Sequence, residues 1–102
     1  MESEMNLQFS PFLLRRIKIA LLKEGFHNTR FQFFKEGQIF GLVKRFSLKQ
    51  LHVRGFIDGS IKAELELWRF LGPFHLLLKP KIAPALQKLK SLLRKHGFAP
   101  FS

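Results

Sequence analysis

The sequence predicts an α+β fold, with an antiparallel meander sheet of four to six strands and an N-terminal and a C-terminal helix packed on one face of it. Apolar residues recur with helical spacing near both ends of the chain, at about 11–24 and 84–97. Between these segments, apolar residues alternate with period two and turn residues interrupt them. At 102 residues the chain is long enough for one core, and we expect residues 1–102 to form a single domain.

The first helix is expected to run over 11–24. Ser10 followed by Pro11 is typical of an N-cap and a first helical turn, and Gly25 is typical of a left-handed stop. Five apolar residues share one face of this helix, which we expect to be core. These residues are Leu13, Leu14, Ile17, Ala20 and Leu21.

The second helix is expected to begin at Ile82 or Pro84 and to end at Gly97. Its glycine is followed by Phe98, as the glycine that ends the first helix is followed by Phe26. This pattern indicates a Schellman motif, in which the apolar residue packs back on the last turn. The apolar face of the second helix consists of Ile82, Ala85, Leu86, Leu89, Leu92 and Leu93.

The alternating region predicts a run of strands joined by short turns. Residues 6–9 are a candidate for a short additional first strand. With that strand, the order of elements would be that of one half of a TATA-binding protein or of a small helix-grip fold, an analogy of topology that carries no function. The expected strands lie near 28–35, 38–46, 51–57, 61–70 and 74–79.

The turn at Asp58 and Gly59 allows the register of one hairpin to be predicted. A two-residue turn would set Val53 opposite a glutamate on the same face. A three-residue loop at 58–60 instead pairs Val53 with Leu65 on the inner face and Arg54 with Glu64 on the outer face. Side-chain alternation therefore favours the three-residue loop.

The chain is strongly basic, and the charge is unevenly distributed. It has 18 Lys and Arg against 7 Asp and Glu, a formal net charge of +11, and no acidic residue from Leu67 to Ser102. Such a surface attracts polyanions over roughly a Debye length, about 8 Å in physiological salt. Nucleic acid or anionic lipid is the expected kind of partner. The alternatives are a Lys-rich surface that serves solubility, or one that matches an acidic protein subunit.

We expect a non-enzymatic nucleic-acid-binding protein that contacts mainly the phosphate backbone of DNA or RNA. Its cations should form one positive surface that no carboxylate interrupts. Cations late in a helix also complement the helix dipole, which offers a purely structural reason for some of them. The candidate phosphate contacts are Lys44, Arg45, Lys49, Lys79, Lys81, Lys88, Lys90, Arg94 and Lys95.

The first helix carries a second apolar ridge opposite its core face. Phe12, Ile19 and Leu22 form this ridge, with Arg15 between them. Either the chain's own termini cover the ridge, or it binds a second copy, a protein partner or a membrane surface. The alternative function is therefore a small protein-interaction subunit or homodimeric adaptor that docks through this ridge.

No motif for catalysis, a metal or a cofactor is present. The chain has no cysteine, and its four histidines fall on different expected elements. Its first nine residues are acidic and contain no apolar run, so we expect no signal peptide there. No apolar run is long enough to span a membrane, and we therefore expect a cytoplasmic protein. Its 13 phenylalanines suggest one further alternative, an apolar-ligand cavity between sheet and helices.

Overall fold

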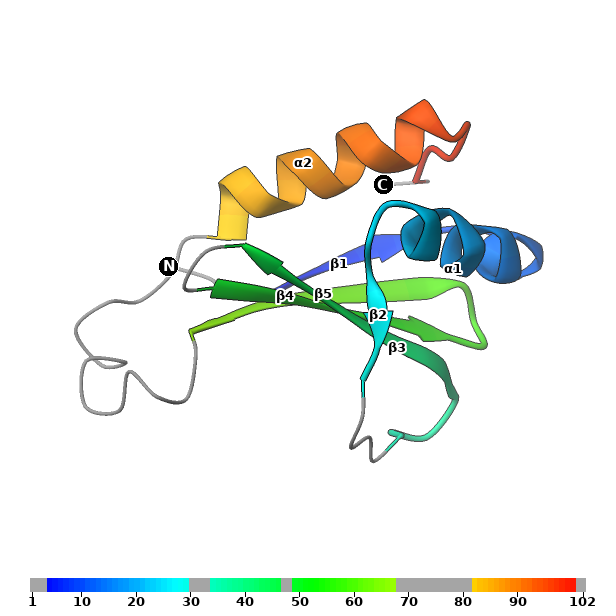
Figure 1. Cartoon of the computed structure of the whole chain (residues 1–102). Coiled ribbons are helices and arrows are strands. Elements are labelled where there is room, and N and C mark those ends of the chain that lie inside the picture. Colours follow the sequence, from blue (N-terminus) through cyan, green and yellow to red (C-terminus); the bar gives the residue numbers. More distant parts are fainter. Residues whose placement is uncertain (1–3, 30–33, 47–48, 68–81, 101–102) are drawn as a thin grey trace.

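The fold is an α+β arrangement of one five-stranded antiparallel sheet with both helices on the same face (Figure 1). The computed structural model describes residues 4–29, 34–46, 49–67 and 82–100. The observed sheet, with both helices on one face, confirms the predicted fold class. The elements are β1 (Glu4–Gln8), the 3-10 turn η1 (Pro11–Leu13), α1 (Leu14–Lys23), β2 (His27–Asn28), β3 (Gln38–Phe46), β4 (Lys49–Phe56), β5 (Ser60–Leu67) and α2 (Ile82–Lys95).

The candidate first strand exists and lies at one edge of the sheet. The strand order is β1-β5-β4-β3-β2, so β1 pairs with β5, the last strand of the meander, and β2 forms the opposite edge. The register of β1 runs from Glu4 opposite Glu64 to Gln8 opposite Ser60. The chain segment containing α1 connects the two edges of the sheet, which lays this helix across one face (Figure 1).

The strand prediction near 28–35 is wrong in length. The edge strand β2 contains only His27 and Asn28, and residues 34 and 35 are not in a strand. A turn takes their place, because the Gln38 amide donates to the Lys35 carbonyl at 2.9 Å and the Gln38 side-chain oxygen accepts from the Lys35 amide at 3.2 Å. The expected strand at 74–79 and the end of the one at 61–70 lie outside the described residues.

Both helices end as their glycines predict. The Phe26 amide donates to the Leu21 carbonyl at 3.0 Å, and Gly25 has a φ of 95°. The same bond joins Phe98 to Leu93 at 2.8 Å, after a glycine with a φ of 89°. These are Schellman motifs, and in each the phenylalanine packs on the core side of the helix end.

The start of the first helix differs from the prediction in one respect. The Ser10 side chain makes no capping hydrogen bond. Instead its carbonyl accepts from the Leu13 amide at 3.0 Å, and Pro11 opens a 3-10 turn before α1 begins. The fixed φ of the proline suits a first turn, so the backbone starts the helix without help from the serine hydroxyl.

The β4–β5 hairpin has the predicted three-residue loop, displaced by one residue to 57–59. Val53 lies opposite Ala63, not Leu65, and Arg54 lies opposite Lys62, not Glu64. Because the pairing is offset by two residues, every side chain keeps its predicted face. The Arg54–Glu64 ion pair still forms, at 3.1 Å, between diagonal neighbours.

Two contacts set this register, and neither of them could be predicted from side-chain alternation. The Asp58 carboxylate accepts from both the amide and the hydroxyl of Ser60, at 2.9 and 2.6 Å, which begins β5 at that serine. The Gly59 carbonyl accepts from the Phe9 amide at 2.9 Å. The loop is therefore fixed to the chain that leaves β1.

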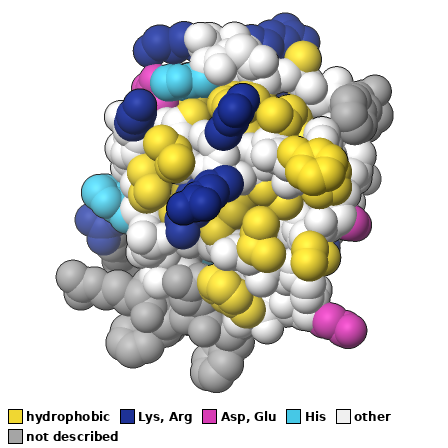
Figure 2. All heavy atoms as spheres, turned by 90° about the vertical axis from the view of Figure 1, so that its right-hand side faces the viewer, with side chains coloured by type: hydrophobic (Ala, Val, Ile, Leu, Met, Phe, Trp, Pro, Cys, Tyr) yellow, Lys and Arg dark blue, Asp and Glu magenta, His cyan; other side chains and the backbone are white. Residues whose placement is uncertain are grey.

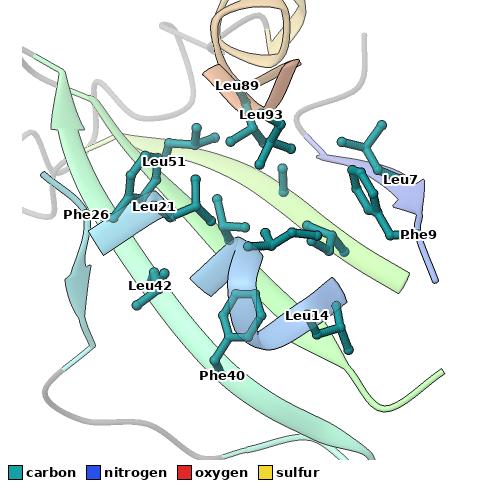
Figure 3. Close-up of a cluster of buried hydrophobic side chains, with 14 of the residues drawn as sticks. Leu7, Phe9, Leu14, Leu21, Phe26, Phe40, Leu42, Leu51, Leu89 and Leu93 are labelled. Atoms are coloured by element: carbon teal, nitrogen blue, oxygen red, sulfur yellow. The ribbon is translucent and has the colours of Figure 1, made fainter. Parts of the chain in front are cut away.

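The core lies between the sheet and the two helices (Figure 3). Leu14, Ile17 and Leu21 of α1 and Leu89 and Leu93 of α2 are fully or almost fully buried. Burying each such side chain stabilises the fold by about 1.5–3 kcal/mol. The sheet contributes Leu7, Phe40, Leu42, Leu51, Val53, Ile61, Ala63 and Leu65.

Alanine substitutions at two glycines should separate backbone strain from steric overlap. Gly97→Ala should lower the free energy of unfolding by about 1–2 kcal/mol, because its φ is 89° and a Cβ there meets no atom. Gly59→Ala should lower it further, by about 2–5 kcal/mol, because its φ is 91° and a Cβ would overlap the Phe9 carbonyl oxygen. Urea unfolding of both variants measures the difference, and equal losses would show that the loop does not pack on the chain after β1.

Candidate nucleic-acid interface

Among the residues that the structure describes, positive charge is concentrated on the helical side of the molecule. We call residues 14–24 and 82–96 the helical layer; it comprises α1, α2 and the residue that follows each of them. The layer contains eight Lys and Arg and one acidic residue, Glu24. The eight cations are Arg15, Arg16, Lys18, Lys23, Lys88, Lys90, Arg94 and Lys95.

The packing of the two helices explains why these cations face solvent. Leu14, Ile17 and Leu21 of α1 and Leu89 and Leu93 of α2 are buried, so the charged residues of both helices occupy other faces. Arg15, Arg16, Lys88 and Arg94 are exposed. Lys18 and Lys90 are half-buried, as expected where a long aliphatic stem covers the apolar boundary of a helix.

The opposite face of the sheet carries mixed charge. Arg54 and Glu64 form an ion pair there, and Glu4 occupies the register position directly opposite Glu64. Lys62 lies two residues from Glu64 on the same strand, and the period of a strand puts both on one face. Acids and bases thus alternate on this face, whereas cations dominate the helical layer.

The predicted phosphate contacts do not all meet on one surface. Lys88, Lys90, Arg94 and Lys95 lie on the helical layer. Lys79 and Lys81 lie outside the described residues. Lys49 is exposed at the first residue of β4.

Lys44 and Arg45 are separated by the alternation of β3. The Lys44 ammonium group donates to the Glu24 carbonyl at 2.7 Å and lies 5.8 Å from the centre of the Phe26 ring, so it caps the end of α1. The side chain of Arg45, the next residue along the strand, belongs to the opposite face. The expectation that these two cations act together on one positive surface is therefore wrong.

One carboxylate interrupts the positive surface, contrary to the prediction. A single Glu24 oxygen, Oε1, lies 3.0 Å from Lys95 Nζ and 3.0 Å from His96 Nε2. Hydrogen bonds from His96 and then Lys95 lower the pKa of Glu24. With Lys44 on its carbonyl, Glu24 joins the ends of α1 and α2 to β3, and we call these four residues the Glu24 junction.

The second apolar ridge of α1 is exposed. The exposed fractions of Phe12, Ile19 and Leu22 are 91%, 47% and 37%. Leu7 and Phe9, near the N-terminal end of the sequence, are buried in the core and do not cover the ridge. Figure 2 shows hydrophobic side chains at the surface on this side of the molecule, with Lys and Arg side chains between them.

The sequence prediction did not group the four cations of α1 with the candidate phosphate contacts of α2. Arg15 was assigned to the apolar ridge, and Arg16, Lys18 and Lys23 lie beside that ridge. The signal that would have identified them was already available, because two amphipathic helices on one sheet face must present their polar sides together. The charge of the two helices should therefore have been considered jointly.

Among the described residues, no three His, Asp or Glu side chains lie close enough to share a metal ion. Nor is any helix in the described ranges long and apolar enough to cross a membrane. No family model, curated protein or solved structure matches the chain. The chemistry of the helical layer is accordingly inferred from its own residues.

Replacing Glu24 by glutamine should lower the thermal stability at neutral pH. Because the folded-state pKa of Glu24 is lowered, its ionised form contributes stability above the ordinary glutamate pKa, and this contribution is lost as the pH falls through the lowered value. The melting temperature of Glu24→Gln should therefore lie below that of the wild type at neutral pH, and the difference should shrink as the pH falls through the lowered pKa of Glu24. Glu36→Gln, in the exposed turn before β3, is the matched control. Equal melting curves for both variants at neutral pH would show that the Glu24 junction does not stabilise the fold.

Proposed function

We propose that this protein is a non-enzymatic nucleic-acid-binding protein that contacts the phosphate backbone through its helical layer. The observation that supports the proposal is the presence of eight cations and one acid on two helices that share one face of the sheet. Phosphate contacts of this kind give affinity without reading sequence. We place its action in the cytoplasm as part of the same proposal.

The cations of both helices act on a ligand through the same electrostatic field. The C-terminal ends of α1 and α2 are in contact, since Glu24 Oε1 lies 3.0 Å from Lys95 Nζ, a distance well below the Debye length of about 8 Å at physiological salt. Along each helix, one turn advances by about 5.4 Å, so side chains from successive turns reach successive points on an extended polyanion. The helical layer is thus suited to a chain of phosphates more than to one small anion.

The helix dipole does not account for the cations at the start of α1. Lys23, Arg94 and Lys95 lie in the last turns of their helices, where a cation is favourable by about 0.3–1 kcal/mol. Arg15 and Arg16 lie in the first turn, where a cation is unfavourable, and no acid accompanies them there. Their charge adds to that of the helix N-terminus, which favours an anionic ligand at this point.

Binding should depend steeply on salt and on the cations of the helical layer. Each phosphate contact contributes about 0.7 to the negative log-log slope of affinity against salt on a single strand and about 0.9 on duplex DNA. The double variant Arg16→Gln, Arg94→Gln should therefore reduce that slope by about 1–2. Fluorescence anisotropy with labelled DNA and RNA at several salt concentrations measures it.

The control removes the same charge from elsewhere on the molecule. Lys35 is exposed in the turn before β3, and Lys62 belongs to the mixed-charge face of the sheet. Lys35→Gln, Lys62→Gln should leave the slope nearly unchanged. Equal effects of the two double variants would place binding outside the helical layer, and affinity indifferent to salt would refute phosphate-backbone binding altogether.

A second candidate function is that of a protein-interaction subunit or homodimeric adaptor. The observation that favours it is the exposure of Ile19 and Leu22 on the outer side of α1. Sedimentation of the wild type and of Ile19→Asp, Leu22→Asp tests the homodimer. The homodimer would be supported if the wild type sediments as a dimer and the variant as a monomer. It would be excluded if the wild type is a monomer at every concentration.

A further inference from the structure

We propose that Phe12 is a stacking platform for an unpaired base, so that the protein prefers single-stranded nucleic acid to duplex. This inference rests on the function proposed above and specifies its ligand. It begins from the exposure of the ring, which is 91% and the highest among the exposed large apolar side chains of the described residues. Because the ring is exposed, core packing does not explain why this position is a phenylalanine.

The backbone that carries Phe12 is firmly held. The Phe9 amide bonds to the Gly59 carbonyl at 2.9 Å, and the Leu13 amide bonds to the Ser10 carbonyl at 3.0 Å. Phe9 itself is fully buried. The ring therefore projects from a fixed turn, which limits the conformational entropy that a ligand must remove on binding.

Two arginines accompany the ring. Arg15 and Arg16 follow Phe12 by three and four residues, the spacings at which side chains are neighbours on a helix, and both are exposed. A guanidinium group binds phosphate or stacks on a base, and an aromatic ring takes the face of a base. An exposed ring beside cations is the combination that single-strand binding surfaces use.

An unpaired base fits this site better than an apolar partner does. Arg15 separates Phe12 from Ile19 and Leu22, so the ridge is not a continuous apolar patch of the kind that protein docking favours. A second copy of the chain would bring the same cations and a net charge of +11 against its own. In a duplex, base faces are stacked inside the helix, so only a single strand offers one to the ring.

The test compares variants that keep or remove the aromatic face. Phe12→Leu remains apolar but cannot stack, and Phe12→Tyr keeps the ring. Affinities for a labelled oligo(dT) and for a duplex of equal length are measured at one salt concentration and then across a salt series. Thermal melting checks that both variants remain folded.

Phe12→Leu should weaken binding to oligo(dT) by about 5- to 100-fold, the range expected for one stacked base. Its affinity for duplex should change little, and its salt slope should match the wild type because stacking releases no counterions. Phe12→Tyr should bind oligo(dT) nearly as tightly as the wild type does. These three results together would support base stacking.

Other outcomes overturn the inference and can be told apart from failure of the proposed function. If Phe12→Leu binds both forms of DNA as the wild type does, with salt dependence intact, stacking is refuted and phosphate binding stands. If the wild type binds neither form, both proposals fail.

Vesicles of phosphatidylcholine with phosphatidylserine provide a third arm of the experiment. Tight binding of the wild type to these vesicles, without a preference for oligo(dT) over duplex, would refute base stacking.

Discussion

The structure depends on one constraint, the burial of two leucine-rich helix faces on the same side of a single sheet. Leu14 and Leu21 of α1 and Leu89 and Leu93 of α2 fill the space above the strands, so neither helix can rotate without exposing its apolar face. The polar sides of both helices then have to point away from the sheet together. The positive surface is thus a consequence of core packing combined with a sequence that places almost no acids on these helices.

The Glu24 junction shows how the fold limits the repulsion between these cations. The single carboxylate of the layer lies where the C-terminal ends of α1 and α2 meet, in contact with Lys95 and His96. Lys44 reaches the same point from the sheet and satisfies a carbonyl at the end of α1. The acid is therefore used for structure at one end of the layer, and no acid accompanies Arg15 and Arg16 in the first turn of α1.

Sequence rules predicted correctly those features, such as the helix ends, that depend on residues close together in the sequence. Gly25 and Gly97 end their helices as expected, because a left-handed glycine followed by an apolar residue is a short-range signal. The hairpin register depends on the Asp58 side chain and on a bond from Phe9 to Gly59, which joins residues fifty positions apart and leaves no trace in strand alternation. Alternation did predict the sheet face on which each charged strand residue lies. It could not predict whether cations from different elements come together, because that depends on the topology.

The proposed function requires that nucleic acid binds across α1 and α2. The most direct measurement is a nuclear magnetic resonance titration of the labelled protein with a short oligo(dT), following backbone amides. We expect the chemical shifts of residues 14–24 and 82–96 and of residues around Phe12 to change, and those of the β4 and β5 amides to stay constant. Shifts concentrated on β4 and β5, with the two helices unaffected, would contradict the proposed function.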